Sequence, residues 1–283
     1  LKTSSPRIQT NCTPACPSGN RTPGYWMRGQ PEKHAPGFIT PGDVLFVGLT
    51  NDGIVGGLAR VGRAGGMWGH VVVVTSVPER VANNGAFAAR LQDHWPANVH
   101  EMWMVKTAES CRDHDGLHEA YSLIYAEPGT SRFILLGELN EALLEFTLNN
   151  EAMEVWQSPA MVRRNMKANL VRDVLAEMRE QTDNWSFLTA AKAVIMGSSC
   201  SNQLALSEIE DCWHTPPICT SIAIVFWQRY LCKIGPLMSQ DPCSLILQFM
   251  PLKADRALPS EVLHSMESTG WTRRTAFAPM AAL

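Results

Sequence analysis

Residues 70–75 read His70-Val71-Val72-Val73-Val74-Thr75, a β-branched run that predicts a buried strand. Upstream, the turn signal Pro41-Gly42-Asp43 leads into the apolar run 44–48, which predicts another strand. We assign Asp43 to capping this turn rather than to catalysis, because a carboxylate after Pro-Gly commonly caps a turn. The first half of the chain is therefore predicted to form a sheet, with further strands at 101–107, 132–136 and 152–157.

From residue 159 onward the apolar residues recur at helical spacing. This spacing predicts an amphipathic helix over 161–181 and a second helix over 184–196. Pro216-Pro217 precede an apolar helix that begins near residue 218, and prolines 242 and 259 start two shorter helices. Because strands come first and helices mostly afterwards, the order predicts an α+β domain rather than a doubly wound sheet.

The 283 residues are expected to form one large folded domain with a leader and a tail. Residues 1–38 are rich in Pro, Gly, Ser and Thr, which predicts an extended or poorly ordered leader. Residues 39–270 are the predicted domain, with a polar insertion near 198–215, and 271–283 are the predicted C-terminal tail. Residue 1 is Leu and no apolar signal core follows, so we expect a processed or partial chain.

Composition and charge exclude several classes of protein. Hydrophobic residues make up 45% and charged residues 18%, so the chain is not disordered throughout. The 24 basic and 27 acidic residues give a net charge of -3, which argues against a nucleic-acid partner. The most apolar run, 218–227, is about half of the roughly 18 to 20 residues that a bilayer needs. We therefore expect a soluble chain with no transmembrane segment.

The eight cysteines show no CxxC or Cys/His zinc spacing, and we expect neither a metal nor an organic cofactor. Three glycosylation sequons would suit a secreted protein but also arise by chance, so the compartment stays open, with the cytoplasm favoured. Four histidines crowd around the third strand, where chance clustering is favoured over a metal site because no fixed ligand spacing is present: His94, His100, His114 and His118.

Cys219 is the candidate nucleophile. It lies at the predicted start of an apolar helix, where free amides and the helix dipole stabilise a thiolate. A thiolate needs an imidazole within hydrogen-bond reach, and His70, after a glycine-rich loop, is the candidate partner. A cysteine that only packs in a buried helix is the alternative interpretation.

The order of four motifs resembles a known family. Pro-Gly-Asp-Val-Leu-Phe at 41–46 is followed by Gly69-His70-Val71, by a helix that opens on Cys219-Thr220-Ser221, and by Leu258-Pro259-Ser260-Glu261. This order resembles the circularly permuted papain-like hydrolases, relatives of the NlpC-type cell-wall peptidases and the lecithin:retinol acyltransferases. The resemblance covers about 40–270. It implies a permuted papain-like α+β fold, with an antiparallel sheet from the first half packed against helices from the second half.

The resemblance also implies roles for individual residues. Cys219 would be the nucleophile, with its own amide in the oxyanion hole, and His70 the general base. The family places a glutamate that orients the histidine on the next strand, and here that position holds Thr107. Glu109 lies two residues later and faces the same side of a strand, so we take Glu109 as the third catalytic residue, with Thr107 as the alternative. Trp68 is a candidate for lining a substrate groove.

The expected function is a cysteine hydrolase, a peptidase or amidase, or an acyltransferase that works through a Cys-His pair and an acyl-enzyme. Its substrate would be a peptide, an amide or an acyl ester. A lipid substrate would suit the apolar residues 222–227, although burial of that helix explains them equally well. Two alternatives stay open: a catalytically weak or inactive papain-like fold that serves as a binding or scaffold protein, and a secreted disulfide-stabilised domain in which Cys219 is oxidised.

Overall fold

The computed structural model describes a large part of the chain, and every described residue belongs to the compact unit Glu32–Leu283. The predicted leader, the predicted helix over 184–196 and the predicted insertion, apart from Trp213, lie outside the described residues. The described residues are 39–48, 68–82, 91, 94–110, 117–130, 132–140, 145–181, 213 and 218–274.

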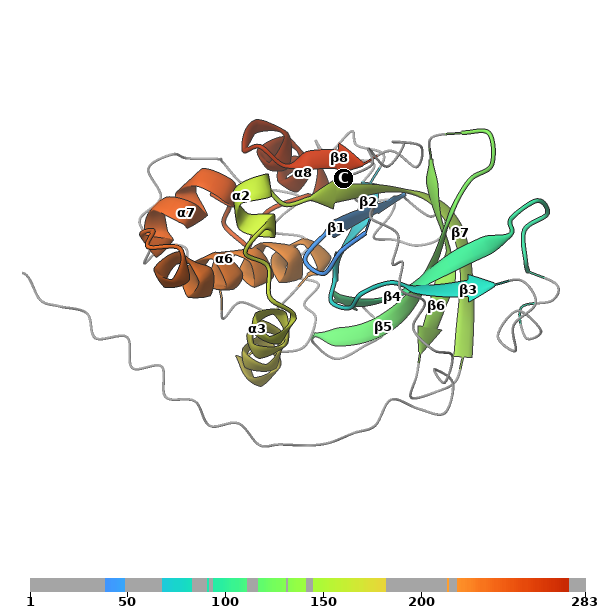
Figure 1. Cartoon of the computed structure of the whole chain (residues 1–283), viewed down its shortest axis with the longest axis horizontal. Helices are drawn as coiled ribbons and strands as arrows, with labels where there is room; N and C mark the ends of the chain where they lie inside the picture. The colour runs from blue at the N-terminus through green and yellow to red at the C-terminus, as the bar shows by residue number, and fades with distance from the viewer. Residues whose placement is uncertain are drawn as a thin grey trace, which may run out of the picture. The chain divides into compact units, whose positions relative to one another are not determined.

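The described strands form one antiparallel sheet (Figure 1). Its order is β1-β2-β4-β5-β6-β7, and β1 also pairs with β7, so these strands close into a six-stranded barrel. Two further strands lie outside this ring, where β3 pairs with β4 and β8 pairs with β7. The strands are β1 Val44–Gly48, β2 Trp68–Val74, β3 Glu79–Ala82, β4 Glu101–Glu109, β5 His118–Ala126, β6 Phe133–Asn140, β7 Glu145–Gln157 and β8 Thr272–Arg274.

The predicted fold class, a permuted papain-like α+β domain with an antiparallel sheet from the first half packed against helices from the second, is wrong. The sheet closes on itself, because β1 pairs on one edge with β2 and on the other with β7. The strands do not all come from the first half either, since β8 follows the described helices and joins β7. The described fold thus runs past residue 270, and Trp271 is 5% exposed.

Alternate residues of the barrel strands feed two different cores, as expected where a strand is covered on both faces. In β1 and β2, Leu45 and Val72 point into the barrel, whereas Phe46 and Val71 point outward against the helices. Both strands therefore read as unbroken apolar runs. A third core covers the outer face of β4, β5 and β6, including Met102, Leu123, Tyr125, Ile134 and Leu136.

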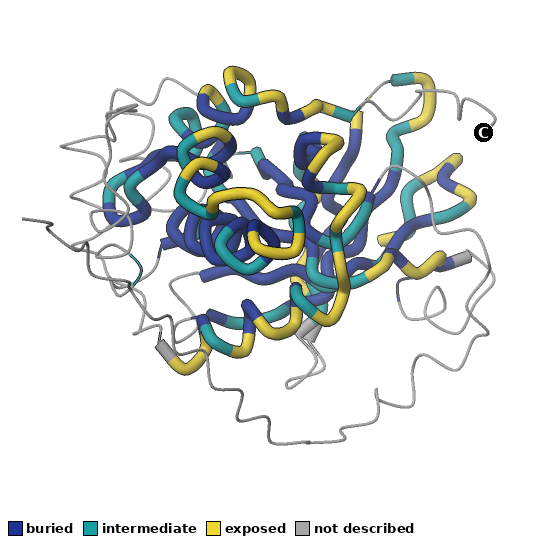
Figure 2. The backbone as a smooth tube through the Cα atoms, turned by 60° about the vertical axis from the view of Figure 1, so that its left-hand side comes forward, coloured by how far each residue is buried: buried dark blue, intermediate teal, exposed yellow. Residues whose placement is uncertain are grey.

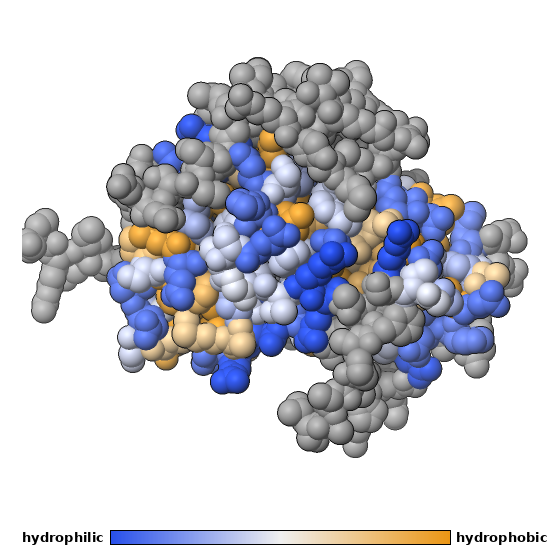
Figure 3. Space-filling view, turned by 90° about the horizontal axis from the view of Figure 1, so that it is seen from above, coloured by the Kyte–Doolittle hydropathy of each residue, from blue (hydrophilic) through white to orange (hydrophobic). Residues whose placement is uncertain are grey.

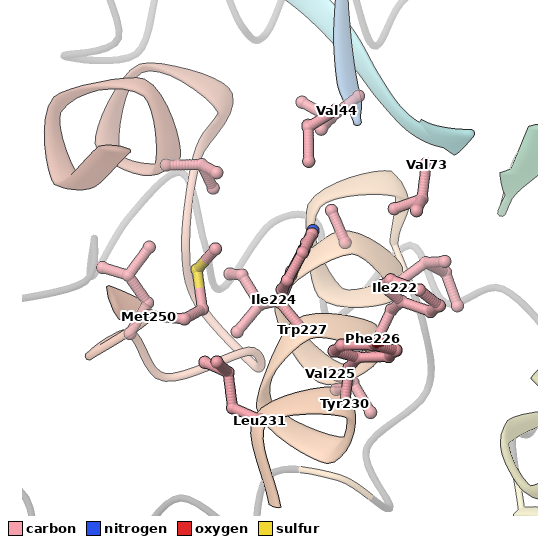
Figure 4. Close-up of a cluster of buried hydrophobic side chains, with 14 of the residues drawn as sticks. Val44, Val73, Ile222, Ile224, Val225, Phe226, Trp227, Tyr230, Leu231 and Met250 are labelled. Carbon is pink, nitrogen blue, oxygen red and sulfur yellow. The ribbon is translucent and has the colours of Figure 1, made fainter. Parts of the chain in front are cut away.

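The described helices gather on one side of the strands (Figure 1). They are α2 Ala160–Arg163, α3 Ala168–Gln181, α6 Cys219–Leu237, α7 Pro242–Phe249 and α8 Pro259–Ser268. The central helix is α6, which is buried along most of its length (Figure 2). Its side chains Phe226, Trp227 and Tyr230 pack among the outward-facing valines Val44 and Val73 (Figure 4). None of the helices in the described segments is long and apolar enough to cross a membrane.

The starts of α6, α7 and α8 agree with the sequence prediction. Asp241 caps α7, accepting the Ser244 amide at 2.8 Å, and Pro242 follows it. The predicted continuous helix over 161–181 is wrong, because the chain breaks between α2 and α3. At the break the amide of Lys167 donates to the Tyr230 hydroxyl at 3.0 Å instead of to a carbonyl of its own turn. Packing against α6 therefore overrides the helical pattern.

Candidate functional site

Polar side chains occupy the inner face of the barrel at the end where α6 begins. His70 on β2 lies two and four residues before Val72 and Val74, which both fill the interior. It pairs with Val47 on β1, directly beside a break in the β1–β2 register. The His70 side chain is 25% exposed, so it lies at the rim of the barrel and within reach of a ligand from solvent.

Cys219 is the first residue of α6, and the helix start is held by buried hydrogen bonds. Ser221 Oγ accepts the amide of Ile218 at 3.0 Å, and Thr220 Oγ1 donates to the carbonyl of Ala257 at 2.7 Å. Amides in the first turn of a helix lack partners within that helix and point at whatever precedes it. The Cys219 thiol is free and partly exposed.

Glu109, the last residue of β4, orients the histidine. Its Oε2 is hydrogen-bonded to Nε2 of His70, and its side chain is only 3% exposed. Because Nε2 is engaged by Glu109, the remaining ring nitrogen, Nδ1, is left for the hydrogen bond between His70 and Cys219. The structure thus brings Cys219, His70 and Glu109 into one chain of contacts.

Thr107, the alternative third residue, is also buried, but its hydrogen bonds run along the sheet. Its hydroxyl lies 2.9 Å from that of Ser122 and donates to the carbonyl of Ala120 at 3.4 Å. Thr107 and Glu109 share the inner face of β4, as two residues of one strand parity must. Glu109 is nearer the rim, and its longer side chain is the one that contacts His70.

The electrostatics favour a charged pair. Burial lowers the pKa of His70, but the charge of Glu109 and the hydrogen bonds to Cys219 and Glu109 outweigh it and raise that pKa well above its ordinary value. Burial raises the pKa of the Cys219 thiol, but the hydrogen bond and charge of His70, with backbone hydrogen bonds at Val71 and Thr220, lower it below its ordinary value. The arrangement therefore stabilises a thiolate beside an imidazolium.

Two more carboxylates face the interior near this site. Glu138 lies opposite Ser122 across β5 and β6, and Glu151 lies opposite Leu135, which belongs to the barrel interior. A register shift at Gly137 brings Glu138 onto the inner face, and only glycine fits there, since a Cβ would clash with the Thr147 carbonyl. Burial, with the charges of Glu109 and Glu151, raises the pKa of Glu138 to about 8. Glu138 is therefore mostly protonated at neutral pH.

Other sequence candidates lie elsewhere. Trp68 is 9% exposed and packs in the core between barrel and helices, so it does not line a groove. Residues 222–227 are buried in the same core, which explains their apolar character without a lipid ligand. Asp43 caps its turn as predicted, accepting the Thr40 amide at 2.8 Å. His114 lies outside the described residues, and within these no group of His, Cys, Asp and Glu side chains could hold a metal ion.

One residue of this site, His118, was not predicted to belong to it. It begins β5 directly opposite Glu109, and its Nε2 lies 3.2 Å from Oε1 of Glu109. The missing signal was the strand itself, because residues 118–126 were not predicted to form one. A hairpin from β4 into β5 would have placed the two residues side by side.

Comparison of the chain with protein-family models, with curated proteins and with solved structures finds no match in any of the three. The resemblance to the permuted papain-like hydrolases therefore stays a prediction that rests on its short motifs.

Proposed function

We propose that the protein is a thiol-dependent hydrolase or acyltransferase in which Cys219 attacks the carbonyl carbon of an amide or ester. The observation that carries the proposal is the chain of contacts from Cys219 through His70 to the buried Glu109. A nucleophile, a base within hydrogen-bond reach and a third group that orients the base are the parts of nucleophilic acyl transfer. Peptides, amides and acyl esters all offer the carbonyl that this chemistry needs.

The reaction follows from the charged pair. The thiolate sulfur of Cys219 forms a bond to the carbonyl carbon, and the amide hydrogens at the start of α6 stabilise the oxyanion. When the bond to the leaving amine or alcohol breaks, His70 donates its Nδ1 proton to that group. Water or an acceptor amine then attacks the thioester and gives a proton back to His70. The carbon–sulfur bond breaks, and the thiolate is restored.

Exposure supports this assignment of roles. Cys219 and His70 are partly exposed, as groups that meet a substrate must be, whereas the Glu109 side chain is nearly sealed from solvent. A buried carboxylate with a charged partner orients the imidazole and stabilises its protonated form. The alternative of an inactive scaffold rests on Thr107, which stands where the family has its glutamate. The contact of Glu109 with His70 weakens this alternative, because Glu109 supplies a carboxylate from two residues further along the strand.

The test is the pH dependence of cysteine alkylation by iodoacetamide, with each cysteine followed by mass spectrometry. Cys219 is expected to label fastest, with an apparent pKa below the roughly 8.5 of a free cysteine. Cys232 and Cys243, which are also partly exposed, serve as internal references. In His70→Ala the apparent pKa of Cys219 should rise. A Cys219 that labels no faster than Cys232, and that ignores His70→Ala, would rule out the proposal.

Turnover is tested separately with a panel of amide and ester probes. An active protein forms a thioester adduct on Cys219, seen as a mass increase equal to the acyl group, and Cys219→Ala forms none. Release of the acyl group to water identifies a hydrolase, and faster release with added amines identifies a transferase. A reactive Cys219 without any acyl adduct across the panel would favour the scaffold alternative.

A further inference from the structure

The carboxylate of Glu109 is held from two sides. Its Oε2 contacts His70, and its Oε1 lies 3.2 Å from Nε2 of His118 on the neighbouring strand β5. The pairing is built into the sheet, since Glu109 and His118 are directly opposite in the β4–β5 register. The His118 side chain is 19% exposed, so this second histidine is largely inside the protein as well.

We infer that His118 is a positioning residue for the Cys219–His70 pair and that it acts through Glu109. The inference rests on the proposed function and adds a fourth residue to its machinery. His118 reaches the reacting atoms through its contact with Glu109. It fixes the carboxylate that in turn fixes the imidazole of His70.

The physical reason is the freedom of a glutamate side chain at the end of a strand. A carboxylate with one anchored oxygen still rotates about its terminal torsion, which has a broad energy profile. An N–H donated to the second oxygen removes that rotation and satisfies an acceptor that is cut off from water. Held at both oxygens, Glu109 presents Oε2 to His70 in one orientation.

His118 also affects the pKa of the Glu109 carboxyl. Burial raises the pKa of Glu109, yet the charge of His70 and the hydrogen bonds from His118 and His70 hold it well below its ordinary value. His118 thus helps to keep Glu109 charged, and a charged Glu109 is what stabilises the His70 imidazolium.

Glu119, the next residue of β5, has a different set of partners from His118 because it lies on the opposite face of the strand. Glu119 follows His118 and points outward, where it lies 3.7 Å from Lys106 and pairs with Arg179 of α3. That outer network joins the barrel to a helix and does not include His70 or Cys219. The inward face of the same strand end carries the link to the site.

The experiment measures Cys219 alkylation by iodoacetamide against pH in full-length variants, which needs no known substrate. His118→Leu removes the donor, and we expect its Cys219 to label about tenfold more slowly at pH 6.5, with an apparent pKa about one unit higher. His118→Gln places an amide N–H near the position of Nε2 and should restore the rate to within about threefold. His264→Leu is the matched control, because the His264 side chain is 79% exposed and distant in the sequence. It should leave the rate unchanged.

A double-mutant cycle separates positioning from mere structural support. In a Glu109→Gln background, His118→Leu should cause no further loss of Cys219 reactivity, because its route of action is already gone. The inference is overturned if His118→Leu labels like the wild type, or if it costs the same factor in both backgrounds. His118→Asn, whose amide is too short to reach Glu109, repeats the test should the leucine variant fail to fold. If Cys219 of the wild type is no more reactive than Cys232, the proposed function itself is contradicted, and not only the role of His118.

Discussion

Asp43 and Glu109 are two carboxylates in the same barrel with opposite electrostatics. Asp43 is 1% exposed and Glu109 is 2% exposed, so burial is equal. Burial raises the pKa of Asp43 to about 7, because the hydrogen bonds of Thr40 and Gln157 and the charge of Arg163, which contacts Gln157, offset burial only in part. For Glu109 burial acts in the same direction, but His70 and His118 supply charge and hold the pKa low. At equal depth, the acid whose carboxylate contacts two histidines is the one that stays ionised.

The difference separates a structural acid from a candidate catalytic one. Asp43 satisfies a turn and links through Gln157 to Arg163, whose Nη1 lies 2.5 Å from the Gln157 amide oxygen. A proton on Asp43 costs this network little, because neutral donors and acceptors remain paired. A proton on Glu109 removes its negative charge, and a neutral Glu109 no longer stabilises the imidazolium of His70.

The largest expected effect comes from removing the charge of Glu109 while keeping its shape. Glu109→Gln should lower kcat on a reactive ester or amide by up to about 10⁴, the loss seen when a carboxylate that orients a catalytic histidine becomes an amide. Without the negative charge, the pKa of His70 falls and the pKa of Cys219 rises. Turnover and the pH profile of Cys219 alkylation both report this change.

Asp43→Asn is the matched control for that variant, since it neutralises an equally buried carboxylate outside the site. Its Cys219 should label at the wild-type rate. If Asp43→Asn impaired Cys219 as strongly as Glu109→Gln does, burial of charge in this barrel would explain both results. The distinction between the two acids would then fail.

The second prediction concerns stability and uses Asp43 itself. The carboxyl binds its proton more tightly in the folded protein, with a pKa of about 7, than in the unfolded chain, at about 3.9. Its contribution to the free energy of unfolding is therefore fully present below pH of about 4 and is lost as the pH rises through 7. The loss amounts to a few kcal/mol, taking about 1.4 kcal/mol per pKa unit.

Asparagine keeps the neutral form at every pH. Its side-chain oxygen can accept from the Thr40 amide while its NH₂ donates to the Thr40 hydroxyl. The difference in free energy of unfolding between Asp43→Asn and wild type should therefore grow from pH 4.5 to pH 8, measured by urea unfolding at each pH. The subtraction cancels Glu138, whose pKa is also raised. A difference that stays constant with pH would contradict the raised pKa of Asp43.

Sequence patterns predicted several helices and strands correctly, but they did not predict that the sheet closes into a barrel. β1, β2, α6, α7 and α8 carry local signals: apolar runs buried on both faces, or a proline at or just before the first helical turn. The pairing of β1 with β7 joins residues more than 100 positions apart, and no local pattern encodes it. β8 is three residues long and lies within 271–283, the predicted tail. The barrel was therefore out of reach, because its closure depends on long-range pairing.

The candidate site divides in the same way. Cys219 and His70 carried local signals, a helix start and a strand entrance, and the strand parity of β4 was enough to select Glu109 beside Thr107. His118 depends on the register between β4 and β5, and β5 itself was not predicted. Glu138 faces inward only because of the irregularity at Gly137, a feature of pairing rather than of composition.

The smallest expected effect extends the comparison to an exposed carboxylate. Asp241 is exposed at the start of α7, and hydrogen bonds from the Ser244 hydroxyl and amide, both at 2.8 Å, lower its pKa. The stabilising effect of the Asp241 carboxylate is present above its pKa in the unfolded chain and is lost as the pH falls through its lowered pKa in the folded protein.

Asp241→Ala should lower Tm by a few degrees at most at pH 7, because one capping interaction is removed from a short helix. Asp241→Asn keeps a capping oxygen and should retain most of the Tm while losing the dependence on acid pH. A Tm for Asp241→Ala that equals the wild type from pH 3 to pH 7 would show that hydrogen bonds without burial do not couple this carboxylate to folding.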